Sequence, residues 1–487
     1  MEDSVLRNQE PADVFFYFEE LSKIPRGSGN EQAVSDYLVS FAKTHGLYVV
    51  QDAAQNVLIK SPGSAGYENS PGVVIQGHMD MVCEKAPGVI HDFLKDPIRL
   101  QVRDDMLYAT GTTLGADDGI AVAMGLAVLA DKSIPHPPLE LLVTTCEETG
   151  MDGAHALDPE TISGRTLINI DSEEEGILTV SCAGGCTARI SIPVSWEHPA
   201  ADMAFLTLTV EGLKGGHSGI EIHKGRANAN KLIARLLDHL TEKMSISLCS
   251  IDGGSKHNAI ARDARAVLGF RKEDEALLRE EVEKLERVLQ DECKTVDPDL
   301  RILLASPEKQ PEQAFTANSA HQIIQFLYLI PNGVQTMSMD IEGLVESSLN
   351  LGVIETKENA VEIISAIRSS VGSIKADIFH TIVSLANLTN GKVIEESSYP
   401  EWRYNPDSKV RTLFADLYEK MFGQKPLINA IHAGLECAIF DEMFGGKMDM
   451  ISIGPSMVGV HTAEEHLSIP STQRTWELLK EALKAMC

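Results

Sequence analysis

Positive charge is scarce in this sequence. Its 487 residues include 42 Lys and Arg against 71 Asp and Glu, which gives a formal net charge of −29 at pH 7. Nucleic acid and anionic membranes bind basic surfaces, so this imbalance argues against either as the main partner. The excess of carboxylates is compatible with cation binding but does not show it, because most acidic side chains lie on the solvated surface.

Long hydrophobic runs and a disulfide framework are also missing. No stretch approaches eighteen consecutive apolar residues, and residues 1–14 lack the basic start and apolar core of a secretory signal. The eight cysteines are scattered along the chain, so we expect reduced thiols and a cytoplasmic location. Cys182 and Cys186 lie close together, but no second Cys or His pair completes a tetrahedral zinc site.

The length and composition are those of a globular protein with more than one domain. Hydrophobic residues make up 43% of the chain and charged residues 23%. Apolar runs at 73–76, 139–145 and 165–171 predict buried strands, which alternate with helical patterns such as 11–23 and 111–131. This alternation predicts an α/β domain with a mixed sheet and helices on both faces.

Local signals predict where some of these elements begin and end. Gly77 is expected to end the strand that starts at Val73. Asn30 and Ser471 are expected to be the N-caps of a second helix and of the closing helix. The polar segment 85–108 is expected to form a long loop with edge strands.

The middle of the chain has a different pattern. Half-exposed strands are predicted at 205–210 and 264–271, followed by a charged amphipathic helix at 273–292. Further strand and helix signals follow before the α/β pattern returns after Tyr399. The pattern predicts an α+β domain, of one or two similar halves, inserted into the first domain. The expected boundaries are 1–186 and 400–487 for a catalytic domain and 187–399 for an inserted lid.

Polar side chains gather where the predicted strands of the α/β domain end, which is where open α/β sheets place their chemistry. They are His78, Asp80, Asp117, Glu147, Glu148, Asp171 and His461. Taken singly, each has a plain structural alternative: a loop histidine, a helix cap for Asp117 or Asp118, or a solvated acidic pair. Taken together, imidazole and carboxylate suit zinc, manganese or cobalt better than calcium or copper.

The set is large enough for two ions. A dinuclear site needs a bridging carboxylate and roughly two further ligands for each ion. Asp117 is the natural bridge, because it lies at a glycine-flanked turn before a helix of small residues, where two ions can approach closely. Glu147 and Glu148 would repel each other without a cation nearby. With a metal present, one of the two can bind it while the other accepts a proton from water.

Several motifs occur in an order and at spacings that resemble a known family. They are GHMDMV, GTTLGADDGIAVAM, TCEETGMDGA, INIDSEEEG, KGGHSG, HAGLE and IGPSMVGVHTAEE. The sequence resembles the M20 family of dinuclear zinc peptidases over nearly the whole chain, and in particular its branch of aminoacyl-histidine dipeptidases. Two departures are visible: Ala-Ile-Ala-Arg follows Asn258 where the branch has Ala-Ile-Pro-Arg, and Asp118 stands where related chains often have Asn.

The resemblance implies a role for each residue of the predicted site. His78 and Asp171 would bind one metal ion, Glu148 and His461 the other, and Asp117 would bridge them. Asp80 would orient the His78 imidazole by a hydrogen bond, and Glu147 would be the general base. In the lid, His217 of KGGHSG would stabilise the oxyanion, with a buried structural histidine as the alternative. Substrate-binding roles are also implied for Asn258 and Arg368, which would bind the carboxylate, and for Glu436, which would bind the free amine.

The sequence therefore predicts a cytoplasmic metallo-dipeptidase that cleaves Xaa-His and related dipeptides. It would use two zinc ions per subunit, with cobalt or manganese as alternatives, and could form a homodimer through a lid that closes during turnover. Another M20 amidohydrolase is the nearest alternative, acting on N-acyl amino acids or on a broader range of di- and tripeptides. A metal-dependent binding protein without catalysis is a second alternative, which an intact Glu147 and five ligands argue against.

Overall fold

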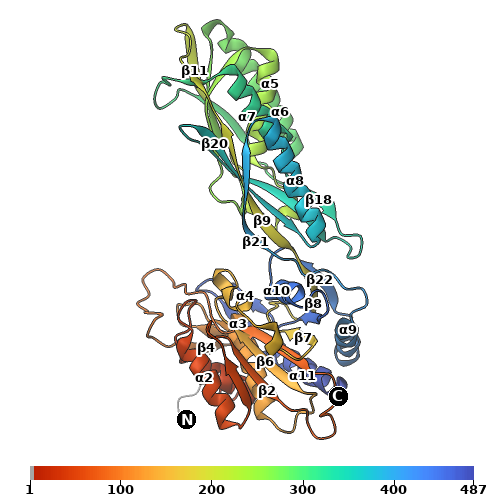
Figure 1. The fold of residues 1–487 in the computed structure, drawn as a ribbon. Helices are drawn as coiled ribbons and strands as arrows, with labels where there is room; N and C mark the ends of the chain where they lie inside the picture. Colours follow the sequence, from red (N-terminus) through yellow and green to blue (C-terminus); the bar gives the residue numbers. More distant parts are fainter. Residues whose placement is uncertain (1–4) are drawn as a thin grey trace. The chain divides into compact units, whose positions relative to one another are not determined.

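The computed structural model describes residues 5–487, which fold into two compact units (Figure 1). The first unit runs to Cys182 and resumes over Trp402–Ala430 and Leu435–Cys487. The second unit comprises Ala183–Glu401 and the short segment Ile431–Gly434. The chain therefore leaves the first unit, builds the second, and then returns.

The first unit is built on a sheet in the order β1-β2-β6-β3-β7-β23-β8-β22. Its central strands β6, β3, β7 and β23 are parallel, whereas β1, β2 and β8 pair antiparallel to their neighbours. Every residue of β3 and β6 is buried, as their apolar sequences predict. The strands are β1 (Tyr48–Gln51), β2 (Val57–Ser61), β3 (Val73–His78), β6 (Leu139–Thr144), β7 (Thr166–Asn169), β8 (Ile177–Cys182), β22 (Leu427–Ile431) and β23 (Asp449–Ser452).

Helices pack on this sheet and on one another. Helix α3 packs on β3 and α1 packs on α3, while α2 contacts β1 and β2, α9 contacts β23 and β8, and α11 contacts α9. These helices are α1 (Ala12–Ser22), α2 (Gln32–Thr44), α3 (Ala116–Ala130), α4 (Asp152–His155), α9 (Lys409–Phe422), α10 (Glu436–Met443) and α11 (Ile469–Ala485). Helix α3 is apolar all round and buried from Ala116 to Leu129, which makes it the central helix of the unit. The α/β architecture is the one expected.

The first unit also contains a small separate sheet of four strands in the order β24-β25-β5-β4. Its strands are β4 (Leu100–Arg103), β5 (Met106–Ala109), β24 (Met457–Val458) and β25 (His466–Ser468). The antiparallel pairing of β24 with β25 closes the loop that carries His461. The expected edge strands within 85–108 correspond in part to β4 and β5.

Three of the expected boundaries were wrong. Gly77 does not end β3, which continues to His78, because this glycine allows close packing: a Cβ there would lie 2.4 Å from Asp118 Oδ2 and 2.6 Å from the Ala121 Cβ. Helix α2 begins after Glu31 and not at Asn30. Helix α11 begins after Ser468, whose Oγ accepts from the Ser471 backbone N–H at 3.3 Å, because Pro470 fits the first turn of a helix.

The second unit contains a nine-stranded sheet made of two similar halves. The order is β16-β11-β15-β13 in one half and β19-β20-β9-β21 in the other, with β18 paired to β19. Both halves order their strands alike, and β13 and β19 join them in antiparallel pairing. The strands are β9 (Gly184–Pro193), β11 (Met203–Glu211), β13 (Ile246–Gly253), β15 (Ala264–Arg271), β16 (Arg301–Ala305), β18 (Gly333–Met337), β19 (Val345–Thr356), β20 (Ala360–Ser369) and β21 (Lys392–Tyr399).

Four long helices accompany this sheet, two from each half: α5 (Ala229–Lys243), α6 (Glu275–Cys293), α7 (Ala317–Leu329) and α8 (Gly372–Leu388). Apart from the extra strand β18, each half has the sequence strand, helix, two strands, helix, strand, and one half lies within the chain of the other between β9 and α7. Two short strand pairs complete the unit: β10 (Trp196–Glu197) with β17 (Ala314–Phe315), and β12 (Gly216–His217) with β14 (Ala259–Ile260).

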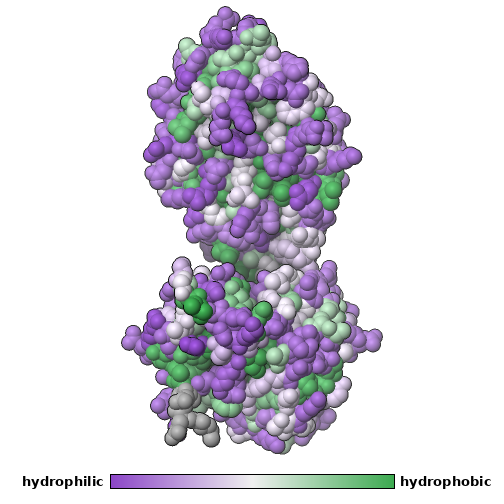
Figure 2. All heavy atoms as spheres, turned by 90° about the vertical axis from the view of Figure 1, so that its left-hand side faces the viewer, coloured by the Kyte–Doolittle hydropathy of each residue, from purple (hydrophilic) through white to green (hydrophobic). Residues whose placement is uncertain are grey.

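Hydrophilic side chains cover most of the visible face of each unit, and apolar residues are scattered among them (Figure 2). No helix among residues 5–487 is both long enough and apolar enough to cross a membrane.

Candidate metal centre and substrate groups

The predicted ligands of the first unit meet at the carboxyl ends of its parallel strands. His78 is the last residue of β3, and Asp171 follows β7 by two residues. Glu147 and Glu148 lie in a 3-10 turn that begins three residues after the end of β6. Asp117 lies in the first turn of α3, and His461 in the loop between β24 and β25. Because these strands are parallel neighbours, their ends bring distant parts of the sequence together.

Asp117 faces two imidazoles with its two carboxylate oxygens. Its Oδ1 lies 3.0 Å from His78 Nε2, and its Oδ2 lies 3.1 Å from His461 Nε2. Two ligand atoms that share a zinc ion at about 2.0–2.2 Å in tetrahedral geometry lie roughly 3.3 Å from each other. The distance from Asp117 to each imidazole is therefore close to the distance between two ligands of one ion. Asp117 could share one ion with His78 and a second ion with His461.

Each imidazole has a second carboxylate beside it. Asp171 Oδ1 lies 3.5 Å from His78 Nε2, and Glu148 Oε2 lies 2.9 Å from His461 Nε2. Candidate ligand atoms of Asp117, Glu148 and His461 all lie within 4.8 Å of one another. The same 4.8 Å limit holds for two groups that include His78. One group is His78 with Asp118 and Asp171, and the other is His78 with Glu147 and Glu148.

Burial makes the charge of this cluster costly. It raises the pKa of Asp171 to about 7 and the pKa of Glu147 well above its ordinary value. Burial also acts on Asp117, but hydrogen bonds with His461 and His78 hold the pKa of that carboxyl well below its usual range. Hydrogen bonds with Asp117 and Glu148 raise the pKa of His461 to about 11. More carboxylates than imidazoles share this buried space, so the donor set fits divalent cations.

Asp80 connects the first ligand to the acidic turn. It is fully buried, and its Oδ1 lies 3.4 Å from His78 Nδ1. The same carboxylate accepts from the backbone N–H groups of Glu147 at 3.1 Å and Glu148 at 3.4 Å. The sequence predicts only the contact between Asp80 and the His78 imidazole. The contacts with backbone N–H groups could not be predicted, because backbone donors leave no signal in a sequence motif.

Glu436, the first residue of α10, lies in the interior of the first unit. It is fully buried, and its Oε2 accepts from Gln76 Nε2 at 2.6 Å and from Thr144 Oγ1 at 2.8 Å. Its other oxygen has no hydrogen-bond partner among the residues that the structure describes. Burial raises the pKa of Glu436 to about 7.

The second unit brings together two of the predicted substrate groups. His217 Nδ1 accepts from the backbone N–H groups of Gly219 at 3.2 Å and Ile220 at 3.1 Å, so the imidazole proton is on Nε2. A Cβ on Gly219 would lie 3.1 Å both from His217 Cε1 and from Arg368 Nε, so glycine makes room between them. Asn258 adjoins this site through its backbone carbonyl, which accepts from the Ser218 N–H at 2.9 Å.

Three further residues lie near Arg368 that sequence reasoning did not single out. The Arg368 guanidinium donates to the Tyr399 hydroxyl at 2.8 Å. Burial and the nearby Arg368 charge lower the pKa of His257, and they lower the pKa of His432 to about 3. His257 precedes Asn258, and His432 begins the HAGLE motif that contains Glu436. Their position beside predicted substrate-binding residues is the sequence signal that could have identified both histidines.

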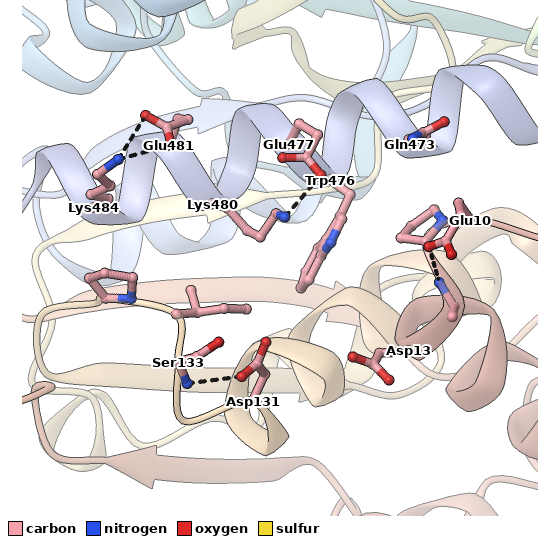
Figure 3. A pocket seen from close by; sticks show the side chains of 14 residues that line it. Glu10, Asp13, Asp131, Ser133, Gln473, Trp476, Glu477, Lys480, Glu481 and Lys484 are labelled. Carbon is pink, nitrogen blue, oxygen red and sulfur yellow. Dashed lines mark hydrogen bonds and ion pairs between the residues drawn. The ribbon is translucent and has the colours of Figure 1, made fainter.

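A hollow of about 420 Å³ elsewhere in the first unit contains none of the predicted site residues (Figure 3). Trp476 and charged side chains of α11 line it, and several of these charges pair within the helix. Lys480 lies 2.9 Å from Glu477, and Lys484 lies 3.1 Å from Glu481. The candidate site is therefore the cluster at the strand ends and not this hollow.

Comparison with known proteins decides the family. The model of a peptidase dimerisation domain of the M20 type matches residues 208–297, which cover most of the first half of the second unit. The chain is 40% identical to the cytosol non-specific dipeptidase of Escherichia coli K12, over 99% of each chain. It belongs to the M20 family of metallopeptidases. The resemblance expected from its motifs is thereby confirmed.

Solved structures agree with this membership. The aminoacylhistidine dipeptidase from Vibrio alginolyticus is 38% identical, with a TM-score of 0.95 over 99% of this chain and 98% of that one. A tripeptidase from Staphylococcus aureus has the same fold at 17% identity, with a TM-score of 0.57 over 98% and 99% of the two chains. The M20 chain thus combines the α/β catalytic fold with a separate dimerisation, or lid, domain.

Proposed function

We propose that this M20 protein is a dinuclear metallo-dipeptidase that hydrolyses Xaa-His and related dipeptides. The position of Asp117 carries the proposal, because its two oxygens face His78 and His461 separately. The relatives at 40% and 38% identity are named as dipeptidases, and one of these names specifies aminoacyl-histidine substrates.

The proposed ligand sets follow the distances around Asp117. His78 and Asp171 would hold one ion, Glu148 and His461 would hold the other, and Asp117 would contribute an oxygen to each. We propose zinc, which imidazole and carboxylate ligands favour, with cobalt or manganese as substitutes. When bound, the two ions would make water a stronger nucleophile and polarise the scissile carbonyl.

Glu147 is the proposed general base. Its carboxylate accepts a proton from the attacking water and then donates it to the leaving amine. Asp80 places this residue, because it accepts hydrogen bonds from the backbone of both glutamates of the turn. The same carboxylate lies 3.4 Å from His78 Nδ1 and orients the imidazole, so one side chain aligns a ligand with the base.

The second unit is the proposed lid and supplies groups for the rest of the substrate. His217 presents an Nε2–H, which is the donor that an oxyanion needs. Arg368 has a buried Nε that makes no hydrogen bond among the described residues, and it is proposed to bind the substrate carboxylate together with Asn258. Glu436, with one oxygen free of partners within residues 5–487, is proposed to bind the substrate amine.

Two finer properties belong to the same proposal. The dimerisation-domain match favours assembly into a homodimer through the second unit. A cytoplasmic location is proposed from the name of the Escherichia coli relative and from the scattered cysteines, all eight of which are free thiols.

The substrate is tested by parallel assays of carnosine, other dipeptides, tripeptides and N-acyl amino acids, before and after chelation. We expect dipeptides to be hydrolysed best and chelation to abolish the activity, with zinc restoring it. A preference for N-acyl amino acids or tripeptides would contradict the dipeptidase proposal and favour another M20 amidohydrolase. Metal analysis of the purified protein then shows whether two ions are bound per chain.

A further inference from the structure

The segment Arg26-Gly27-Ser28-Gly29-Asn30-Glu31 connects α1 to α2 and contains none of the proposed ligands or the base. It contacts three of the loops that carry catalytic groups of the first unit. These are the end of β3, the turn before α3 and the turn after β6. The segment, called the brace below, thus connects these three loops from outside them.

Arg26 makes the largest share of these contacts. Its side chain is buried, with 2% exposure, and its Nη1 donates to the carbonyl oxygens of Met79 at 2.9 Å and Asp80 at 3.2 Å. Its Nη2 donates to the carbonyl oxygen of Gly115. A Cβ at Gly115 or Gly119 would lie 2.6 Å or 2.5 Å from Nη2, so the guanidinium requires glycine at both positions.

The turn before α3 is gripped from its other side by Glu465. This buried carboxylate accepts from the backbone N–H groups of Leu114 at 2.7 Å, Gly115 at 3.0 Å and Ala116 at 2.8 Å. Arg26 binds a carbonyl of the same turn, so the backbone just before Asp117 is fixed through both its donors and its acceptors.

The rest of the brace reaches the turn that carries the base. Ser28 Oγ donates to Asp80 Oδ2 at 2.8 Å, and Asp80 accepts from the Glu147 backbone. Glu31 Oε1 accepts from the Cys146 backbone N–H and from its thiol, both at 3.2 Å. Each end of the brace is therefore bonded to a residue next to a catalytic group.

We propose that this brace sets the spacing between the metal ligands and the base, with Arg26 as its positioning residue. The proposal rests on the proposed metallo-dipeptidase function, since it assigns the ions and the base as above. A planar guanidinium can donate in two directions at once, whereas an ammonium offers a single point charge. Arg26→Lys therefore keeps the positive charge but removes the link between the β3 end and the turn before α3.

The experiment compares Arg26→Lys with Arg165→Lys. Arg165 also donates to two carbonyls, of Ile162 and Gly164, but lies at the amino end of β7, opposite the end that leads to Asp171. Metal-depleted enzyme is titrated with Co²⁺ and followed by visible absorption, and kcat and KM are measured on carnosine with zinc restored. Thermal unfolding by circular dichroism reports the stability of each variant.

For Arg26→Lys we expect the second Co²⁺ to bind roughly 10- to 100-fold more weakly and kcat to fall by a similar factor. We expect KM to stay within about threefold, because the brace touches no group proposed to bind substrate. Arg165→Lys is expected to match the parent in all three quantities. A purely structural role for Arg26 would lower the unfolding temperature while leaving the Co²⁺ spectrum and kcat of the folded protein unchanged, and would overturn the proposal.

Ser28→Ala decides the matter if Arg26→Lys does not fold. It removes one hydrogen bond to Asp80, and we expect both Co²⁺ ions to bind while kcat falls several-fold; an unchanged kcat would contradict the brace. Failure of the proposed function can be told apart from failure of the brace. If the parent protein binds two Co²⁺ ions but cleaves no dipeptide, the proposed function is wrong, and the Co²⁺ titration of Arg26→Lys still tests the brace.

Discussion

The two units contain polar clusters of opposite charge. In the first unit, carboxylates outnumber imidazoles around Asp117, and burial raises the pKa of Asp171 and Glu147. In the second unit, burial and the nearby Arg368 charge lower the pKa of His217 and His432. The first cluster suits cations and the second suits an anion, which fits the proposed separation of the hydrolytic groups from those that would bind the substrate carboxylate.

The clusters also differ in how their residues are placed. The acidic cluster is assembled from the ends of parallel strands, and Asp80 and Glu465 hold the backbone of its loops. In the basic cluster, His217 accepts from backbone N–H groups, but Arg368 and His432 bond to side chains: Arg368 to the Tyr399 hydroxyl, and His432 Nε2 to Ser348 Oγ at 2.7 Å. A rigid backbone frame suits ligands that must keep fixed distances, whereas side-chain contacts can adapt to different substrates.

Asp117→Asn should have the largest effect on the acidic cluster. The amide nitrogen cannot act as a ligand, so one of the two ions loses its bridge. We expect at most one metal ion per chain by elemental analysis, and a fall in kcat of roughly a thousandfold, which corresponds to about 4 kcal/mol. Asp118→Asn is the neighbouring control, since its oxygen can still accept from the His78 N–H, and it should keep both ions. Two tightly bound ions in Asp117→Asn would exclude the bridge.

Glu147→Gln and Glu148→Gln separate the base from the ligand within one turn. For Glu147→Gln we expect full metal content and a kcat lowered by roughly 10²- to 10⁴-fold, because the amide cannot accept a proton. For Glu148→Gln we expect weaker metal binding, since its carboxylate lies 2.9 Å from His461 Nε2. Hydrolysis by Glu147→Gln within a few-fold of the parent would show that the base is another residue.

Arg368→Lys tests the basic cluster by itself. Hydrogen bonds to charged groups contribute about 1.5–3 kcal/mol, so kcat/KM for a dipeptide with a free carboxylate should fall roughly 10- to 100-fold, mainly through KM. A dipeptide with an amidated C-terminus should show little difference between parent and variant. Arg189→Lys serves as the control, because Arg189 lies on the adjacent strand β9 in an exposed pair with Glu396. Equal losses on both substrates would mean that Arg368 does not recognise the carboxylate.

The difference between the clusters also explains what the sequence could predict. His78, Asp171 and the two glutamates follow apolar runs, so strand ends alone bring them together. Arg26 and Glu465 were missed because their partners are backbone groups, which have no side-chain signature. The sequence could not decide between one half and two similar halves in the second unit. The halves are alike in their strand order, and short alternating strands do not specify which strands they pair with. Gly77 was misjudged because glycine marks both chain breaks and close packing.

The smallest expected effect concerns the pH dependence of stability in the basic cluster. Burial and Arg368 hold the pKa of His432 at about 3, whereas an unfolded histidine has a pKa of about 6.5. Between these values the unfolded chain binds an extra proton, so acidification removes stability, and above both values there is no effect. One such group costs about 1.4 kcal/mol between pH 7.5 and pH 5.5.

The measurement is the free energy of urea unfolding at pH 7.5 and pH 5.5 for the parent, His432→Gln and His380→Gln. Each protein is compared with itself, so any loss of packing in a variant cancels. His432→Gln should lose less stability on acidification than the parent, by about 1 kcal/mol. His380 is exposed on α8, and its replacement should leave the difference unchanged. If His432→Gln keeps the full pH dependence, the pKa of His432 is not lowered in the folded protein, which would contradict the effect expected of burial and Arg368.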